Sequence, residues 1–362
     1  MKVVHCADLH LDSRMNTYLT KEQAKERKQE LLKTFLRMVS FAAEDGAKAI
    51  IIAGDLFDTR SVSVTTRNTV RDAIVGHPEI DFLYLRGNHD ADSFLNKLEE
   101  IPANLKLFGD TWTTYSYGSV AVTGIEMPGE VPPSIYHSLT LDYDVYNIVV
   151  MHGQVVSQKP GSNGELVYLG GLRNKNIDYL ALGHLHEYQI QRLDARGIYC
   201  YSGCPEGRGF DECGDKGFVR LAIDENTRTA KLKFVKAAER ILYSVPVDVT
   251  DVMTTQEAAQ RIEAELAARS IPQKSLVRIE LTGEVTVDSE INTDFLQDMF
   301  AEYFYYEKVV NSTRMKVDFT SYEKDISLKG EFIRMIMESE MIEEKKAEVI
   351  RCGILALSGE EI

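Results

Sequence analysis

The sequence contains little cysteine. Its 362 residues include five cysteines, an odd number spread from Cys6 to Cys352, and this pattern does not support a disulfide framework in a chain of this length. Cys200, Cys204 and Cys213 lie close enough in sequence to raise a zinc site. Their spacing matches no common zinc finger, so buried or reduced thiols are the favoured interpretation.

Long apolar runs, internal repeats and low-complexity segments are also absent. The amino-terminal stretch MKVVHCADLH is interrupted by His5 and Asp8, unlike a signal peptide or a membrane span. We therefore expect a cytoplasmic protein that does not enter a membrane.

Lys and Arg do not outnumber Asp and Glu, and the formal net charge is -15. At first sight this argues against a nucleic-acid partner, because phosphate contacts need Lys and Arg. Residues 1–240 nevertheless hold 28 basic and 32 acidic side chains, against 13 and 24 in residues 241–362. Two divalent cations bound to the first part would offset its small deficit at the place where a phosphate binds. Overall charge therefore leaves the partner open.

The residue pattern predicts an α/β protein. KVVHCA (2–7) and KAIIIA (48–53) are typical of buried strands, and between them a helix is expected from Thr20, its N-cap, to Asp45, with Gly46 as the stop. A second helix over 62–75 and the strand DFLYLR repeat this unit. Further strands are expected at 120–125, 146–152, 177–183, 188–193, 197–203, 217–223 and 230–236, separated mainly by turns. We expect parallel strands in the first half, antiparallel pairing in the second, and a two-sheet sandwich flanked by helices.

The order of predicted strands and helices changes near residue 241. This change predicts domains at 1–240 and 241–320 and a helical segment at 321–362. The small α+β domain is expected to contain strands at 242–249, 275–283, 306–311 and 314–319 and helices at 255–269 and 293–303. The last segment suits two amphipathic helices, whose apolar positions are Phe332, Ile333, Ile336, Met337, Val349, Ile350, Ile354 and Leu357. These helices either lie on a partner helix or pack on each other.

Polar side chains follow five predicted strands. In LGHLHEY, His184 and His186 are two residues apart, so they point the same way if the segment is extended; alone, they would be a pair of surface histidines. The other strand ends deliver Asp8 and His10; Asp55 and Asp58; Asn88, His89 and Asp90; and His152. Sites in α/β sheets form at such strand ends. The accompanying Gly54, Gly87 and Gly183 would let the backbone turn closely beside packed ions.

The order D-x-H, G-D-x-x-D, G-N-H-D, H, G-H-x-H resembles the calcineurin-like metallophosphoesterases. The resemblance implies a two-sheet sandwich and a dinuclear centre, commonly manganese in the nuclease branch. Iron, zinc or magnesium are alternatives for this ligand set. On this resemblance one ion takes Asp8, His10 and His186, the other takes Asn88, His152 and His184, and Asp55 bridges them.

The resemblance also implies catalytic roles. His89 would face the scissile phosphate and either protonate the leaving oxygen or stabilise developing charge. Asp58 and Asp90 either orient His89 or metal-bound side chains, or merely cap turns. His5 is interpreted as a residue of the core.

VVHCADLHLD and AGDLFDTR resemble the amino-terminal blocks of SbcD-type DNA repair exonucleases. YSGCPEGRGFDECGDKGFVRL resembles that family's segment after G-H-x-H, where F-x-E and K-G are common, although Cys204 replaces a frequent Ser and 206–208 depart from the commonest loop. The resemblance implies that 241–320 is a capping domain and that the final helices dock an SbcC-like coiled-coil ATPase. It also implies a homodimer, with 62–100 as the candidate surface.

We therefore predict a manganese-dependent DNA exonuclease, with endonuclease action as a second activity, that works beside an SbcC-like ATPase in DNA repair. One alternative is a metallophosphoesterase acting on nucleotides or small phosphodiesters. Another is an inactive scaffold for the ATPase, against which the intact ligand set and His89 argue.

Overall fold

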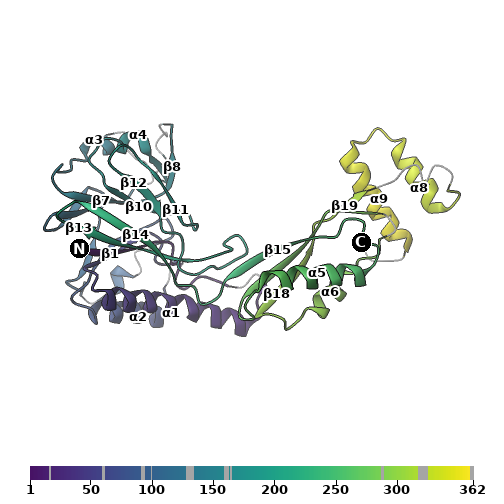
Figure 1. Cartoon of the computed structure of the whole chain (residues 1–362), viewed down its shortest axis with the longest axis horizontal. Helices are drawn as coiled ribbons and strands as arrows, with labels where there is room; N and C mark the ends of the chain where they lie inside the picture. The colour runs from purple at the N-terminus through teal and green to yellow at the C-terminus, as the bar shows by residue number, and fades with distance from the viewer. Residues whose placement is uncertain are drawn as a thin grey trace. The chain divides into compact units, whose positions relative to one another are not determined.

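The computed structural model describes residues 1–15, 18–58, 62–90, 94–98, 100–127, 134–158, 163, 165–286, 289–316 and 325–358. The chain divides into two compact units, Met1–Ile241 and Leu242–Ile362, and each is described by itself (Figure 1). Within the described part of the chain, every helix is too short or too polar to cross a bilayer.

Two six-stranded sheets form the centre of the first unit. The first has the order β14 (Thr229–Lys236), β13 (Gly217–Asp224), β1 (Lys2–Cys6), β2 (Ala49–Ala53), β3 (Asp81–Leu85) and β4 (Leu105–Leu107). The second has the order β11 (Gln189–Arg192), β12 (Ile198–Tyr201), β10 (Tyr179–Gly183), β7 (Tyr146–His152), β6 (Val120–Gly124) and β5 (Thr113–Tyr117). Fully buried residues of both sheets, such as Ile51 and Val150, share one core. The two-sheet sandwich is confirmed.

Helices cover both outer faces of this sandwich. Helices α1 (Lys21–Asp45) and α2 (Val64–Val75) pack on the first sheet, and the short α3 (Ile135–Ser138) and α4 (Leu169–Leu172) lie on the far side of the second (Figure 1). Thr20 begins α1 with a reciprocal capping box, as its position predicts. Helix α2 begins two residues later than expected, because the Ser63 side chain accepts a hydrogen bond from the Thr66 N–H and so takes the N-cap position.

The expected antiparallel pairing is confirmed for β13 and β14, but it is wrong for the centre of the second sheet, which is parallel. Strands β6, β7, β10 and β12 pair in parallel, and only the edge pairs β5–β6 and β11–β12 are antiparallel. The connections are longer than turns: they include α3, the short strands β8 (Gln154–Val156) and β9 (Leu166–Tyr168), and α4. Such connections allow the chain to cross back and run in the same direction. As a result, β7 and β10 end at the same edge.

The second unit contains a three-stranded parallel sheet of β15 (Leu242–Asp248), β16 (Leu276–Thr282) and β18 (Tyr306–Asn311). Helix α5 (Thr255–Arg269) has the predicted bounds. Helix α6 (Thr293–Met299) ends before the expected Tyr303, since Phe300 leaves helical geometry to bury its ring and Glu302 adopts a φ of 74°. Strand β17 (Glu284–Thr286) pairs with β19 (Arg314–Lys316); the rest of the expected strand, 317–319, lies outside the described residues.

Helices α8 (Leu328–Met337) and α9 (Glu343–Ser358) pack on each other, as one of the two interpretations expected. Ile333, Ile336, Ile350 and Ile354 are buried in a small core of their own. Leu357 is predicted on the apolar face of the last helix, but it is 47% exposed in the structure. In the first unit the remaining short element is the 3₁₀ helix Leu95–Lys97.

Candidate metal centre

The predicted ligands come together where the strands of both sheets end. In the first sheet, the Asp8 N–H donates to the Gly54 carbonyl oxygen at 3.0 Å, so the segments after β1 and β2 run side by side. The second sheet joins them there, because the His184 N–H donates to Asp8 Oδ1 at 2.9 Å. Residues 176 positions apart thus share one site.

The backbone of this site adopts conformations that ordinary residues avoid. Asp8, His10, Asp55 and His184 have φ angles of 53°, 45°, 53° and 101°. A non-glycine residue in this region costs about 1–3 kcal/mol, and such residues cluster at functional sites. A Cβ atom on Gly183 would overlap the Ala53 carbonyl oxygen, which confirms the prediction that glycine permits a close approach here.

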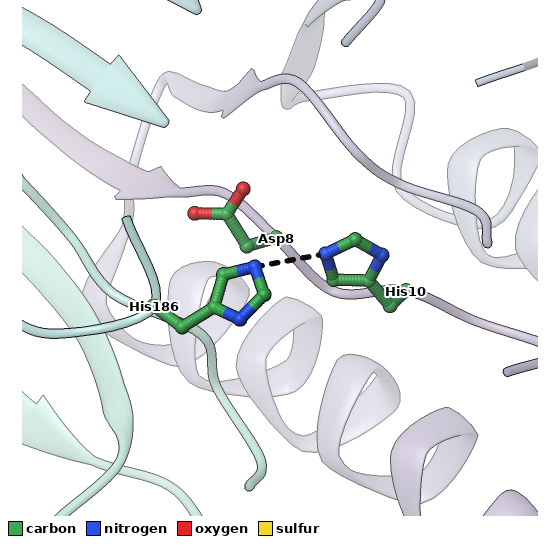
Figure 2. A group of neighbouring side chains, drawn as sticks. All are labelled: Asp8, His10 and His186. Atoms are coloured by element: carbon green, nitrogen blue, oxygen red, sulfur yellow. Dashed lines mark hydrogen bonds between the residues drawn. The ribbon is translucent and has the colours of Figure 1, made fainter. Parts of the chain in front are cut away.

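Asp8, His10 and His186 form the first ligand cluster, with ligand atoms within 4.8 Å of one another. The Nε2 atoms of His10 and His186 lie 3.1 Å apart, and Figure 2 shows these two ring nitrogens directed toward each other. Their other ring nitrogens are directed at carboxylates: His10 Nδ1 lies 3.2 Å from Asp58 Oδ1, and His186 Nδ1 lies 2.7 Å from Glu212 Oε1. If both Nδ1 atoms carry the hydrogen, two Nε2 lone pairs face each other. A cation between them satisfies both.

Asp8, Asp55 and His152 form the second cluster. His152 Nδ1 donates to the Ala53 carbonyl oxygen at 2.9 Å, so in the neutral ring Nε2 carries the lone pair. That Nε2 lies 3.0 Å from Asn88 Oδ1 and 3.4 Å from Asp55 Oδ2. In the metal-free protein these two oxygens accept the hydrogen of a protonated Nε2, and a metal ion would take the place of that hydrogen.

Asp55 joins the two clusters. Its Oδ2 atom is 3.7 Å from His10 Nε2 and 3.4 Å from His152 Nε2, and its side chain is only 2% exposed. The carboxylate thus lies between the histidines of both clusters, and Asp8 belongs to both groups. That Asp55 bridges two ions stays a prediction.

The electrostatics of the site favour a bound positive charge. Burial lowers the pKa of His152, but the hydrogen bond and charge of Asp55 outweigh burial and raise this pKa to about 9. Burial raises the pKa of Asp55, but His152 and His10 hold it below its usual range. For Asp8 burial dominates and raises the pKa. A metal ion would replace the proton on His152 and compensate both carboxylates.

His184 and His89 lie at the margins of the clusters. The His184 ring is 5.4 Å from the His152 ring, measured between centroids, and burial lowers its pKa; its role as a ligand stays a prediction. The His89 side chain is 49% exposed, and its Nδ1 lies 3.1 Å from Asp58 Oδ1. Its backbone N–H donates to Asp55 Oδ1 at 3.0 Å, which fixes the main chain beneath an accessible ring.

Asp58 and Asp90 differ in what they contact. Asp58 Oδ1 lies 3.2 Å from His10 Nδ1 and 3.1 Å from His89 Nδ1. That it orients these side chains stays a prediction. Asp90 accepts hydrogen bonds from the backbone N–H groups of Leu56, Phe57 and Gly87. Of the two interpretations of Asp90, the observed contacts are those of turn capping. Burial raises its pKa to about 7.

The family model described as calcineurin-like phosphoesterase matches residues 1–188, just over half of the chain. This chain is a calcineurin-like phosphoesterase. The match covers the segments that carry every predicted ligand.

The relatives of this phosphoesterase have low sequence identity, but the similarity extends over most of each chain. DNA double-strand break repair protein Mre11 of Saccharolobus solfataricus is 24% identical over 389 residues, covering 100% of this chain and 96% of that protein. The SbcD component of the nuclease SbcCD of Escherichia coli K12 is 25% identical over 349 residues, covering 83% of this chain and 80% of that protein. The uncharacterized metallophosphoesterase YhaO of Bacillus subtilis is 24% identical over 279 residues, covering 72% of this chain and 66% of that protein.

A cavity of about 340 Å³ opens beside the second cluster of this phosphoesterase. It is lined by Arg86, Gly87, Asn88, Asp90, Glu126, Met127, His152 and Glu165. Arg86 is held by Glu126, with 2.6 Å between Nη2 and Oε2. The cavity adjoins Asn88 and His152, so a molecule bound there would contact the ligand set.

Two neighbours of the phosphoesterase site were missed by the sequence reasoning. Glu212 contacts His186, and Arg208 contacts Glu212 at 2.9 Å. The F-x-E pattern contained Glu212 as a signal, but not its partner. Cys200 and Cys204 are buried free thiols and Cys213 is half-buried. Within the described residues no group of neighbouring candidate ligands contains a cysteine, and the interpretation of the three as thiols stays a prediction.

Proposed function

We propose that this chain is a divalent-metal-dependent DNA exonuclease, also active as an endonuclease, that uses two ions, with manganese favoured. The observation that carries the proposal is the pair of ligand clusters joined by Asp55. Relatives named as a DNA repair protein and as part of a nuclease match most or all of the chain, which supports DNA as the substrate.

In this proposal Asp8, His10 and His186 hold one ion, Asn88, His152 and His184 hold the other, and Asp55 bridges them. Bound ions in such a pair activate a water molecule and neutralise the phosphate oxygens during an in-line displacement. Asp58 and Glu212 lie against the Nδ1 atoms of His10 and His186, and with the hydrogens on Nδ1 both Nε2 atoms would be free to coordinate.

His89 is the proposed acid or charge-stabilising group. Asp58 Oδ1 holds one ring nitrogen at 3.1 Å, while 49% of the side chain remains exposed to an incoming substrate. The ring can then donate a hydrogen bond or a proton to the leaving oxygen. Asp90 would support this loop through the backbone rather than through His89.

The proposed organisation is a nuclease domain at 1–240, a capping domain at 241–320 and a docking segment at 321–362. Exposed apolar side chains on the last segment support docking of an SbcC-like ATPase: Leu328 is 68% exposed, Met335 60% and Ile342 62%. Homodimerisation is proposed through the described residues of 62–100, where Val64 and Val75 are 60% and 55% exposed.

Hydrolysis of nucleotides or small phosphodiesters is the second candidate. The cavity of about 340 Å³ beside Asn88 and His152 favours it, because this volume suits a small ligand.

Incubation with Mn²⁺ separates these candidates. End-labelled linear DNA, free nucleotides and a chromogenic diester are offered to the purified chain, to His89→Ala and to the matched control His137→Ala, whose histidine is exposed. We expect DNA cleavage by the wild type and by His137→Ala, and its loss in His89→Ala. Turnover confined to the small substrates would reject the DNA assignment, and no turnover with intact metal binding would favour a scaffold.

A further inference from the structure

The loop between β12 and β13 reaches the first ligand cluster through Glu212. This side chain is 4% exposed, and its Oε1 atom lies 2.7 Å from His186 Nδ1. A carboxylate at this distance accepts the Nδ1 hydrogen and directs Nε2 toward His10.

Arg208 fixes the position of Glu212. Its backbone N–H donates to Oε2 at 2.7 Å, and its guanidinium donates to Oε1 from Nη2 at 2.9 Å. Both carboxylate oxygens are therefore held by one residue. On its other side, Arg208 Nη1 lies 3.7 Å from Asp58 Oδ1, so the guanidinium stands between the carboxylates that contact His186 and His10.

Among the described residues, no carboxylate contacts the Nδ1 atom of His152. This atom donates to the main-chain carbonyl of Ala53, the last residue of β2, and that carbonyl carries no net charge. The two proposed metal positions thus depend on different partners. In the described part of the chain, Arg208 and Glu212 contact His186 and not His152.

We propose that Glu212, held by Arg208, is a positioning residue that orients His186 and sets the affinity of one of the two metal positions. The inference rests on the metal centre of the proposed function. Arg208 lies in the segment 206–208, where this sequence departs from the commonest SbcD-type loop, whereas Glu212 belongs to the F-x-E pattern.

Calorimetric titration of the full chain with Mn²⁺ tests the proposal without relying on activity. The wild type is expected to bind two ions. Glu212→Gln is expected to weaken one binding step about 10–100-fold, the range for loss of such a supporting contact, and to leave the other within about threefold. The matched control Asp211→Asn removes a neighbouring exposed charge and should leave both steps unchanged.

Arg208→Lys gives an independent test, because it keeps the charge but cannot hold the carboxylate in the same way. It should weaken the same step, by less than Glu212→Gln. Arg208 also lies 3.3 Å from His186 Nδ1 through Nη2 and 3.7 Å from Asp58 Oδ1 through Nη1, so only part of its effect passes through Glu212. The double variant should therefore weaken binding by less than the product of the two single effects. Full additivity would overturn this part of the proposal.

The outcomes separate this inference from the proposed function. Two unchanged binding steps in Glu212→Gln, or equal weakening of both, would overturn the inference and leave the metal centre standing. A wild-type chain that binds no Mn²⁺ would overturn both. Urea unfolding of the metal-free variants checks their fold; if Glu212→Gln does not fold, Arg208→Lys decides, with an effect on one step in support and no effect against.

Discussion

Replacement of Glu206 by alanine should strongly destabilise the first unit. The Glu206 side chain is buried, and its carboxylate accepts hydrogen bonds from Arg27 Nη1 at 3.0 Å and Thr34 Oγ1 at 2.8 Å. It also accepts from the backbone N–H groups of Glu239 at 2.7 Å and Arg240 at 3.2 Å. One carboxylate thus joins α1 to the segment that follows β14 and fixes the base of the loop that carries Arg208.

The magnitude follows from what remains after the substitution. Arg27 is 1% exposed and would keep Glu30 as its ionic partner, while two backbone N–H groups would lose their acceptor. Removal of one member of a buried ion pair costs about 3–5 kcal/mol. At about 2–4 °C per kcal/mol for a unit of this size, the melting temperature should fall by roughly 6–20 °C.

Thermal and urea unfolding of the full chain, followed by circular dichroism, measure this effect. The control Asp72→Asn breaks the exposed Arg71–Asp72 pair and should change the free energy of unfolding by less than about 1 kcal/mol. A loss below about 1 kcal/mol for Glu206→Ala would refute the reasoning, because the buried network would then contribute no more than a surface pair.

Three further predictions concern the site. His89→Ala should lower kcat about 10²–10⁴-fold with unchanged Mn²⁺ affinity, and a parallel loss of affinity in a titration would contradict its catalytic role. Gly183→Ala should weaken Mn²⁺ binding at least about tenfold, because its Cβ would overlap Ala53 and His152. The control is Gly109→Ala, which has open space around its Cβ; equal Mn²⁺ affinities of the two variants would contradict the prediction. The pKa of His152 is about 9 in the folded protein, against 6.5 in the unfolded chain. Its protonation therefore contributes fully to the stability of the metal-free protein below pH 6.5, and the contribution is lost as the pH rises through 9. The urea midpoint of the metal-free protein should fall over this interval. Binding of Mn²⁺ at pH 7 should release a proton, which calorimetry in buffers of different ionisation enthalpy measures; an unchanged midpoint and no proton release would exclude a protonated His152.

The sequence predicts the site better than it predicts strand direction. Asp8, His152 and His186 follow strands with clear apolar patterns, so the meeting of their segments follows from ordinary α/β geometry. The sequence pattern does not predict strands β4 and β5, because β4 is short and β5 is only partly buried. The parallel centre of the second sheet was missed, since periodicity marks a strand but not the direction in which a long connection returns it.

Contacts made by irregular loops were the least predictable part of the site. Glu212 meets His186 across 26 residues, and no local pattern encodes that pairing. Asp90 follows His89 directly, yet it turns to the backbone of Leu56 and Phe57. Of the two interpretations left open for Asp90, these contacts match turn capping.

Anomalous diffraction from crystals of this chain soaked with Mn²⁺ tests the central claim most directly. We expect two peaks about 3.5–4 Å apart, one beside Asp8, His10 and His186, the other beside Asn88 and His152, with Asp55 touching both. A single peak, or peaks that Asp55 does not reach, would contradict the dinuclear centre on which the proposed chemistry depends.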